Sequence, residues 1–251
     1  MALFKAGNPA FNEKTINNIQ IEAGQELMTV DGAIKKFGLM LVMVLGAASF
    51  TWGAYYQGVN VMPWAMGASI GALIIAIIII FKKIWAPYLA LAYALLQGLF
   101  LGAISAVLDD AFGKTYPDLI IQAVMLTFGV AIGMFALYYF RIIQATPMFK
   151  KIIIGATIGI ALFYLVTMVM NMFGTQMPYL HSNGLVGIGI SVFIVAVAAL
   201  SLILDFDLIE QGATQGAPKY FEWYCAFGLM VTLIWLYLEM LRLLSKLASR
   251  D

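Results

Sequence analysis

Charged residues are scarce in this chain. Only 11% of the 251 residues are charged, against about 25% in ordinary soluble domains, while 63% are hydrophobic. So few charges cannot cover the surface of a water-soluble protein of this length. The composition therefore excludes a soluble globular domain and predicts a chain that has the lipid bilayer as its solvent.

Cysteine, histidine and net charge are also close to absent. The single cysteine, Cys225, excludes an internal disulfide and a site built from several thiolates. The single histidine, His181, leaves little material for histidine metal ligation or a Ser-His pair. A net charge of +1 does not favour nucleic acid as a partner. Since phosphate-binding glycine loops and HExxH are also missing, we expect neither an enzyme nor a resident cofactor.

Long uncharged runs predict seven membrane-spanning helices. A span needs about 20 apolar residues, so the runs are divided at clusters of glycine, proline and amides. The expected helices are 34–56, 64–81, 86–108, 119–140, 152–173, 185–210 and 219–247. We predict an all-α integral membrane protein with a seven-helix transmembrane domain over 34–251. Residues 1–33 show no pattern of a cleaved leader, and we expect them to form a peripheral polar arm.

Lysine and arginine are distributed unevenly around the predicted spans. With the amino terminus inside, ten of the 14 basic residues fall on the cytoplasmic side. This predicts a multi-pass protein with a cytoplasmic amino terminus. The basic carboxyl end then lies outside, a mild exception to the rule, and six spans with a re-entrant last segment are an alternative.

Glycines recur at four-residue spacing inside four predicted helices. In lipid, small residues let helix backbones approach closely and so hold helices together. We therefore expect four helix-packing faces: Gly67 and Gly71, Gly98 and Gly102, Gly129 and Gly133, and Gly155 and Gly159.

Acidic residues near membrane depth are confined to the last two predicted helices. An ionisable group at that depth usually faces a cavity or a partner. If helix six ends at Leu204, Asp205 lies in the headgroup layer; if it continues to Gly212, Asp205 lies about 10 Å inside that end. Asp205 and Asp207 point to nearly opposite sides of a helix, so only one of them can line a pathway.

Helix seven carries charge within its span. Residues 223–238 are uninterrupted apolar sequence, and Glu239 follows them. Arg242 lies three residues further on, on the same helix face, and is the expected partner of Glu239. The pair is either a neutralised structural ion pair or part of a functional site.

Three passages, taken in order, resemble the Bax inhibitor-1 (transmembrane Bax inhibitor motif) family in its bacterial branch. They are residues 97–105, 205–209 and 236–244, and residues 28–32 resemble the same branch. The resemblance implies six helices in two layers around a central seventh, in a bacterial inner membrane. It also implies a calcium leak that two acids on helices six and seven regulate with pH.

The same resemblance assigns the two acids. Asp205 matches the first acid. The second position falls on Glu239 when residues 236–239 are aligned with the family's Leu-Tyr-Leu-Asp, and on Thr232 when the terminal Leu-Arg is aligned. A turn near 212–218 would put Asp205 level with about Ala226, which favours Thr232. Gln97 stands where many relatives have glutamate.

Two functional hypotheses follow. The first is a pH-sensitive calcium leak channel in which Asp205 and Glu239 offer transient oxygen ligands to Ca²⁺ and Arg242 holds Glu239. Further candidate residues are Asp207, Glu222, Thr232 and Gln97. The second is a non-conducting membrane regulator whose arm binds a partner such as a membrane protease. A proton-linked transporter would need solute-binding groups that the first five predicted helices lack.

Overall fold

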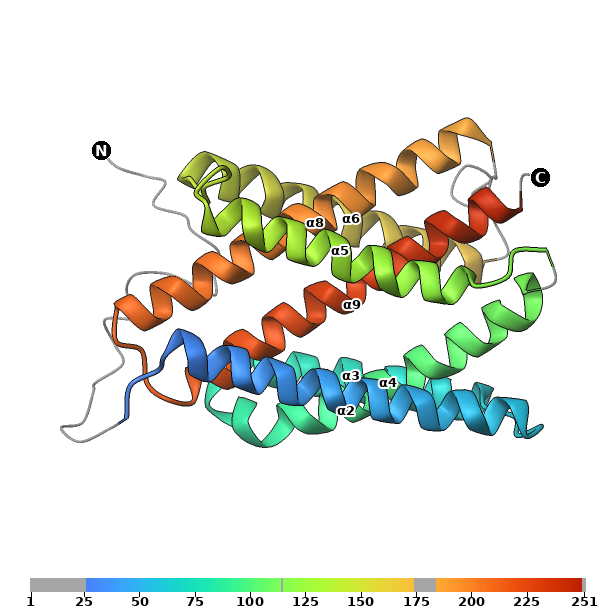
Figure 1. Cartoon of the computed structure of the whole chain (residues 1–251), viewed down its shortest axis with the longest axis horizontal. Coiled ribbons are helices and arrows are strands. Elements are labelled where there is room, and N and C mark those ends of the chain that lie inside the picture. The colour runs from blue at the N-terminus through green and yellow to red at the C-terminus, as the bar shows by residue number, and fades with distance from the viewer. Residues whose placement is uncertain (1–25, 114, 174–183, 250–251) are drawn as a thin grey trace. The chain divides into compact units, whose positions relative to one another are not determined.

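Long helices make up almost all of the computed structural model, which describes residues 26–113, 115–173 and 184–249 (Figure 1). Within these residues, seven helical segments are long and apolar enough to cross a membrane. The helices are α2 (Val30–Tyr56), α3 (Met62–Phe81), α4 (Ala86–Phe112), α5 (Leu119–Tyr139), α6 (Pro147–Met172), α8 (Leu185–Thr214) and α9 (Phe221–Ala248), with a short 3-10 turn, η1 (Lys83–Trp85), before α4. The predicted all-α, seven-helix membrane protein is confirmed.

Local capping chemistry decides where several helices begin. α2 begins at Val30 instead of residue 34, because the Thr29 hydroxyl accepts a hydrogen bond from the Gly32 amide at 2.9 Å. α6 begins at Pro147 instead of residue 152, because Thr146 caps it in the same way and proline suits a first helical turn. Residues 30–33 therefore belong to the first span and not to the polar arm.

The chain forms two compact units. The first unit comprises the described part of Met1–Ala111 together with Asp205–Val231, and the second comprises Phe112–Leu204 with Thr232 onwards. Helices α8 and α9 each contribute one end to each unit. Half of the most apolar stretch of α9 is buried, a larger share than in any other described span. Among the described spans, α9 therefore leaves the smallest share of its most apolar stretch exposed.

Two glycines let α2 and α4 pack closely in the first unit. A Cβ atom on Gly98 would lie 2.4 Å from the carbonyl oxygen of Val44, and one on Gly102 would lie 2.2 Å from that of Ala48. Because backbone atoms stand in the way, no larger residue fits without moving a helix. The packing face predicted for this pair is confirmed.

The other glycine pairs do not behave as expected. Nothing lies within 4 Å of a Cβ built on Gly129, Gly133, Gly155 or Gly159, and the same holds for Gly67. Among the described residues, the pairs Gly129/Gly133 and Gly155/Gly159 are not packing faces, so the prediction was wrong for these two. In the remaining pair Gly71 does meet a neighbour, since a Cβ there would lie 3.1 Å from Leu96 Cδ1. Four-residue spacing brings two glycines to one helix face, but it does not say whether that face meets a neighbour or lipid.

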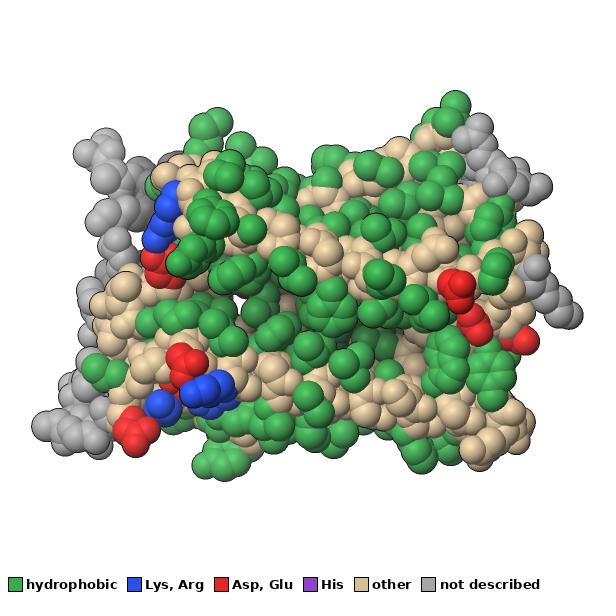
Figure 2. Space-filling view, viewed as in Figure 1, with side chains coloured by type: hydrophobic (Ala, Val, Ile, Leu, Met, Phe, Trp, Pro, Cys, Tyr) green, Lys and Arg blue, Asp and Glu red, His purple; other side chains and the backbone are tan. Residues whose placement is uncertain are grey.

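The outer faces of the helices are apolar. Figure 2 shows hydrophobic side chains over most of the visible helix surfaces, with charged side chains gathered towards helix ends. Large side chains such as Phe81, Tyr88 and Met172 are strongly exposed. A soluble protein does not expose apolar surface on this scale, so these faces contact the lipid bilayer.

Candidate functional site

Asp205 lies within α8, nine residues before its end at Thr214. That distance corresponds to about 14 Å of helix, because α8 continues beyond Leu204 through both acids. Its Oδ2 atom is shielded from solvent, and its Oδ1 atom faces Gly228 on α9, where an added Cβ would lie 3.7 Å away. The glycine thus leaves room for a carboxylate to pack against the α9 backbone.

Asp207 is attached to its own helix. Its Oδ2 atom accepts a hydrogen bond from the Gln211 side chain, one turn further along α8, at 2.6 Å. This agrees with the expectation that Asp205 and Asp207 point in different directions. Asp205, by contrast, lies close to the α9 backbone at Gly228.

Glu239 sits in a polar cluster of the second unit. The predicted partner is present: Arg242 Nη1 lies 2.7 and 2.8 Å from the two carboxylate oxygens of Glu239. Tyr164 of α6 donates a third hydrogen bond to Glu239 at 2.8 Å, and the Arg242 guanidinium lies over the Tyr164 ring. Glu239 is only 1% exposed. The carboxylate is therefore neutralised and well hydrogen-bonded, as a buried charge must be.

The spacing along α9 bears on the second acid position. The residue of α9 that lies opposite Asp205 is Gly228, two residues after Ala226, which the sequence led us to expect there. Thr232 is one turn further along, and Glu239 is three turns, about 16 Å of helix, further along the same face. Of the two residues that the sequence offers for the second acid position, Thr232 and Glu239, both are buried. Asp205 and Glu239 each have their own neighbours.

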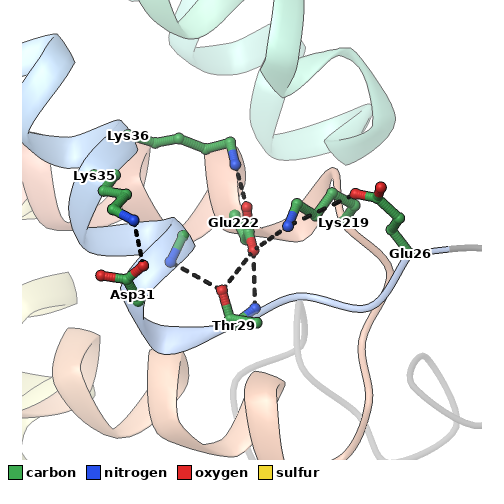
Figure 3. Close-up of polar contacts among 8 residues, drawn as sticks. Glu26, Thr29, Asp31, Lys35, Lys36, Lys219 and Glu222 are labelled. Carbon is green, nitrogen blue, oxygen red and sulfur yellow. Dashed lines mark hydrogen bonds and ion pairs between the residues drawn. The ribbon is translucent and has the colours of Figure 1, made fainter.

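Glu222 is the most enclosed acid of the described chain, although it lies in the first turn of α9. It is fully buried, and four donors point towards its carboxylate (Figure 3). The Thr29 amide and hydroxyl donate to Oε1 at 2.8 and 3.1 Å, and Lys219 Nζ lies 3.3 Å from the same oxygen. Lys36 pairs with Oε2. We call Glu222, Thr29, Lys36 and Lys219 the clamp.

Residues 26–29, here called the strap, run along the turn between α8 and α9. Leu27 forms an isolated β-bridge with Pro218, and the Met28 amide donates to the Ala217 carbonyl at 2.8 Å. The Lys219 amide donates to the Glu26 carbonyl at 2.9 Å. The end of the expected peripheral arm is therefore docked on the first unit, which corrects its boundary. Residues 1–25, like His181, lie outside the described residues.

The comparison with known families decides the identity of the chain. A family model described as Bax inhibitor 1 like matches residues 8–249. The chain belongs to the Bax inhibitor 1 like family. The comparisons with curated proteins and with solved structures found no match.

In this Bax inhibitor 1 like protein, Gln97 forms a polar pair with Tyr93 on α4. Gln97 Nε2 donates to the Tyr93 hydroxyl at 3.3 Å, while the buried Gln97 Oε1 has no hydrogen-bond partner among the described residues. The Tyr93 ring meets Phe227, the residue before Gly228, edge to face at 4.9 Å between centroids. Gln97 thus lies near the level of α9 that Asp205 contacts, on a different neighbouring helix.

The second unit of the Bax inhibitor 1 like protein holds a buried cation, Lys246, in addition to the partly exposed Arg242. Lys246, which is 6% exposed, donates to the Gly187 carbonyl at 2.9 Å and to the Ser191 hydroxyl at 2.8 Å. These bonds fasten the end of α9 to the start of α8. In the sequence, Lys246 is only one of the basic residues at the carboxyl end, because nothing in the local pattern predicts its partners.

No resident metal centre is built into the described part of the chain. There, no group of three or more His, Cys, Asp or Glu residues lies together in a way that could hold a metal ion. Ca²⁺ normally takes six to eight oxygen ligands. Asp205 and Glu239, the two expected calcium ligands, belong to different units.

Proposed function

We propose that this protein is a pH-sensitive calcium leak and that Asp205 is its proton-sensing acid. The observation that carries the proposal is the position of Asp205, inside the apolar helix α8 and against the α9 backbone at Gly228. A carboxylate packed against a neighbouring apolar helix is costly to keep, and such acids usually mark an ion or proton pathway.

The chemistry of the proposed leak follows from a single carboxylate. When it is ionised, Asp205 offers oxygen ligands to a hard cation such as Ca²⁺. When it is protonated, the charge is lost and α8 and α9 can pack against a neutral group. The unpartnered Gln97 Oε1 is a further oxygen near the same level of α9. Few ligands at one level suit an ion that passes, whereas a storage site would need more.

The proposal is tested by calcium flux. Full-length protein is reconstituted into lipid vesicles loaded with a calcium-sensitive dye, and Ca²⁺ entry is followed over a series of pH values. We expect Asp205→Asn to lose most of the pH response. Asp207→Asn is the matched control on the same helix and should keep it. An Asp205→Asn protein with the flux and pH response of the wild type would contradict the proposal.

A second candidate function is a non-conducting regulator that binds a membrane protein such as a protease. The docked strap favours it, because residues 26–29 contact the turn between α8 and α9, where a bound partner could influence both helices. Deleting residues 2–25 while keeping the strap separates the two candidates. A leak should survive the deletion, whereas capture of a protein partner through the arm should be lost.

A further inference from the structure

We infer that Glu222 is a positioning residue for Asp205: the clamp fixes the start of α9 and thereby holds Gly228 opposite the Asp205 carboxylate. This inference rests on the proposed function, in which Asp205 responds to protons. Glu222 itself does not take part in ion passage. It acts through α9 and through the strap.

The contacts of Glu222 are those of an anchor. All four groups that point towards its carboxylate are donors, and they come from the strap, from α2 and from the α8–α9 turn (Figure 3). An ionised carboxylate only accepts hydrogen bonds, so the donor set fits this charged form. Because the carboxylate is fully buried, it cannot exchange these partners for water without moving.

The clamp lies close to Asp205 along both helices. On α9, Gly228 follows Glu222 by six residues, about 9 Å of helix. On α8, Gly212 follows Asp205 by two turns, and a Cβ on Gly212 would lie 2.6 Å from the sulfur of Met28 in the strap. The strap thus touches α8 through Met28 and α9 through Thr29. The strap therefore connects α8 and α9 near their shared turn, on the same side of the two helices' length as the contact between Asp205 and Gly228.

Gly32 offers a way to open the clamp without changing any charge. A Cβ at this position would lie 2.1 Å from Glu222 Oε1, so Gly32→Ala forces the carboxylate out of its place. Gly38 lies on the same helix, and a Cβ there has nothing within 4 Å. Gly38→Ala is therefore the matched control for the same chemical change.

A second pair of variants, at two lysines of α2, disturbs the packing less and so carries a smaller risk of misfolding. Lys36→Met removes the ammonium group that pairs with Glu222 and keeps most of the apolar stem. Its control is Lys35→Met on the same helix, since Lys35 is exposed and forms its ion pair with the exposed Asp31. Each pair thus compares a clamp variant with a neighbour that leaves the clamp intact.

The chain contains its own reporter of the clamp. Cys225, the only cysteine, lies on α9 midway between Glu222 and Gly228 and is 1% exposed. In full-length protein in vesicles, we measure the rate at which a membrane-permeant maleimide labels Cys225, together with the pH profile of Ca²⁺ flux. Gly32→Ala and Lys36→Met should raise the labelling rate about tenfold over their controls, as expected for a local opening made easier.

The pH profile separates positioning from simple support. If the clamp holds Asp205 in its surroundings, both variants should shift the midpoint of the flux response by about half a pH unit or more. Faster labelling with an unchanged midpoint overturns the inference, because the clamp would then only stabilise the fold.

The outcome for the proposed function is read separately. If the wild type shows no pH-dependent flux, the calcium-leak proposal fails, and with it the role of Glu222 towards Asp205. Labelling that is as slow in Gly32→Ala and Lys36→Met as in their controls overturns the clamp itself, whatever the flux does.

Discussion

Tyr164 shows how a single hydroxyl completes the hydrogen bonding of a buried carboxylate. Glu239 and Arg242 lie three residues apart on one helix, and the sequence therefore predicts their contact. Tyr164 comes from α6, and its hydroxyl donates to Glu239 while it accepts from Arg242. A tyrosine in an apolar span signals that its hydroxyl needs a partner, but the sequence does not say which one.

Replacing Tyr164 by phenylalanine should destabilise the second unit. The change removes one hydrogen bond to a buried carboxylate and keeps the ring beneath the Arg242 guanidinium. We expect a loss of about 2 kcal/mol in the free energy of unfolding, as is usual for hydrogen bonds to charged groups. Thermal unfolding in detergent measures it. Tyr88→Phe is the control, since Tyr88 is strongly exposed, and equal stability of the two variants would contradict the expectation.

The clamp residues illustrate the limit of sequence reasoning at this scale. Glu222 was a candidate only because it is an acid close to the turn before the last helix. Its partners Thr29 and Lys36 lie 193 and 186 residues away in the chain. Helix periodicity relates residues three or four positions apart, so contacts of this range depend on the packed fold.

At the scale of elements, the apolar runs predicted which segments span the membrane but not where all of them end. Thr29 and Thr146 start α2 and α6 earlier than the runs suggest, through hydrogen bonds to backbone amides. Similarly, α8 continues through its acids to Thr214. Charged residues can extend a helix beyond its apolar part, and hydropathy does not report that extension.

The contact between α2 and α4 should be sensitive to a single methyl group. Gly98→Ala and Gly102→Ala each place a Cβ against a carbonyl oxygen of α2 that cannot rotate away. We expect each substitution to lower the free energy of unfolding by about 2 kcal/mol, because an overpacked contact must open. The measurement is thermal unfolding in detergent.

Alanine at Gly129 provides the control for the α2–α4 contact, since a Cβ there has nothing within 4 Å. That substitution should be neutral or slightly stabilising, because alanine is the better helix former. If Gly129→Ala were as damaging as Gly98→Ala, the cost would come from the glycine-to-alanine change itself and not from the contact with α2.

At the scale of the whole molecule, the scarcity of charge was sufficient to predict a membrane protein. The order of three short passages was sufficient to predict the family, which the match over residues 8–249 confirms. The division into two units could not be predicted in this way. The three boundaries between the units fall inside helices α4, α8 and α9, where the sequence shows no linker.

The distribution of lysine and arginine predicts the orientation of the molecule. Lys82 and Lys83 follow α3, whereas the turn between α2 and α3 holds no basic residue. An alkaline phosphatase fused after Asn60 should therefore be active in bacterial cells, because that enzyme works outside the cytoplasm. The same fusion after Lys83 should be inactive. The opposite pattern would place the amino terminus outside.

The long reach of the clamp also dictates an order of biosynthesis. Thr29 and Lys36 enter the membrane with the first span, whereas Glu222 is made only after five further spans have been synthesised. Residues 205–231 of the first unit likewise follow most of the second unit along the chain. The first unit therefore stays incomplete until the ribosome has synthesised residues 112–204 of the second unit. A chain that stalls before α9 would lack Glu222, so Lys36 would have no carboxylate partner and α2 would not be attached to α9. Quality-control proteases can recognise such an incomplete form.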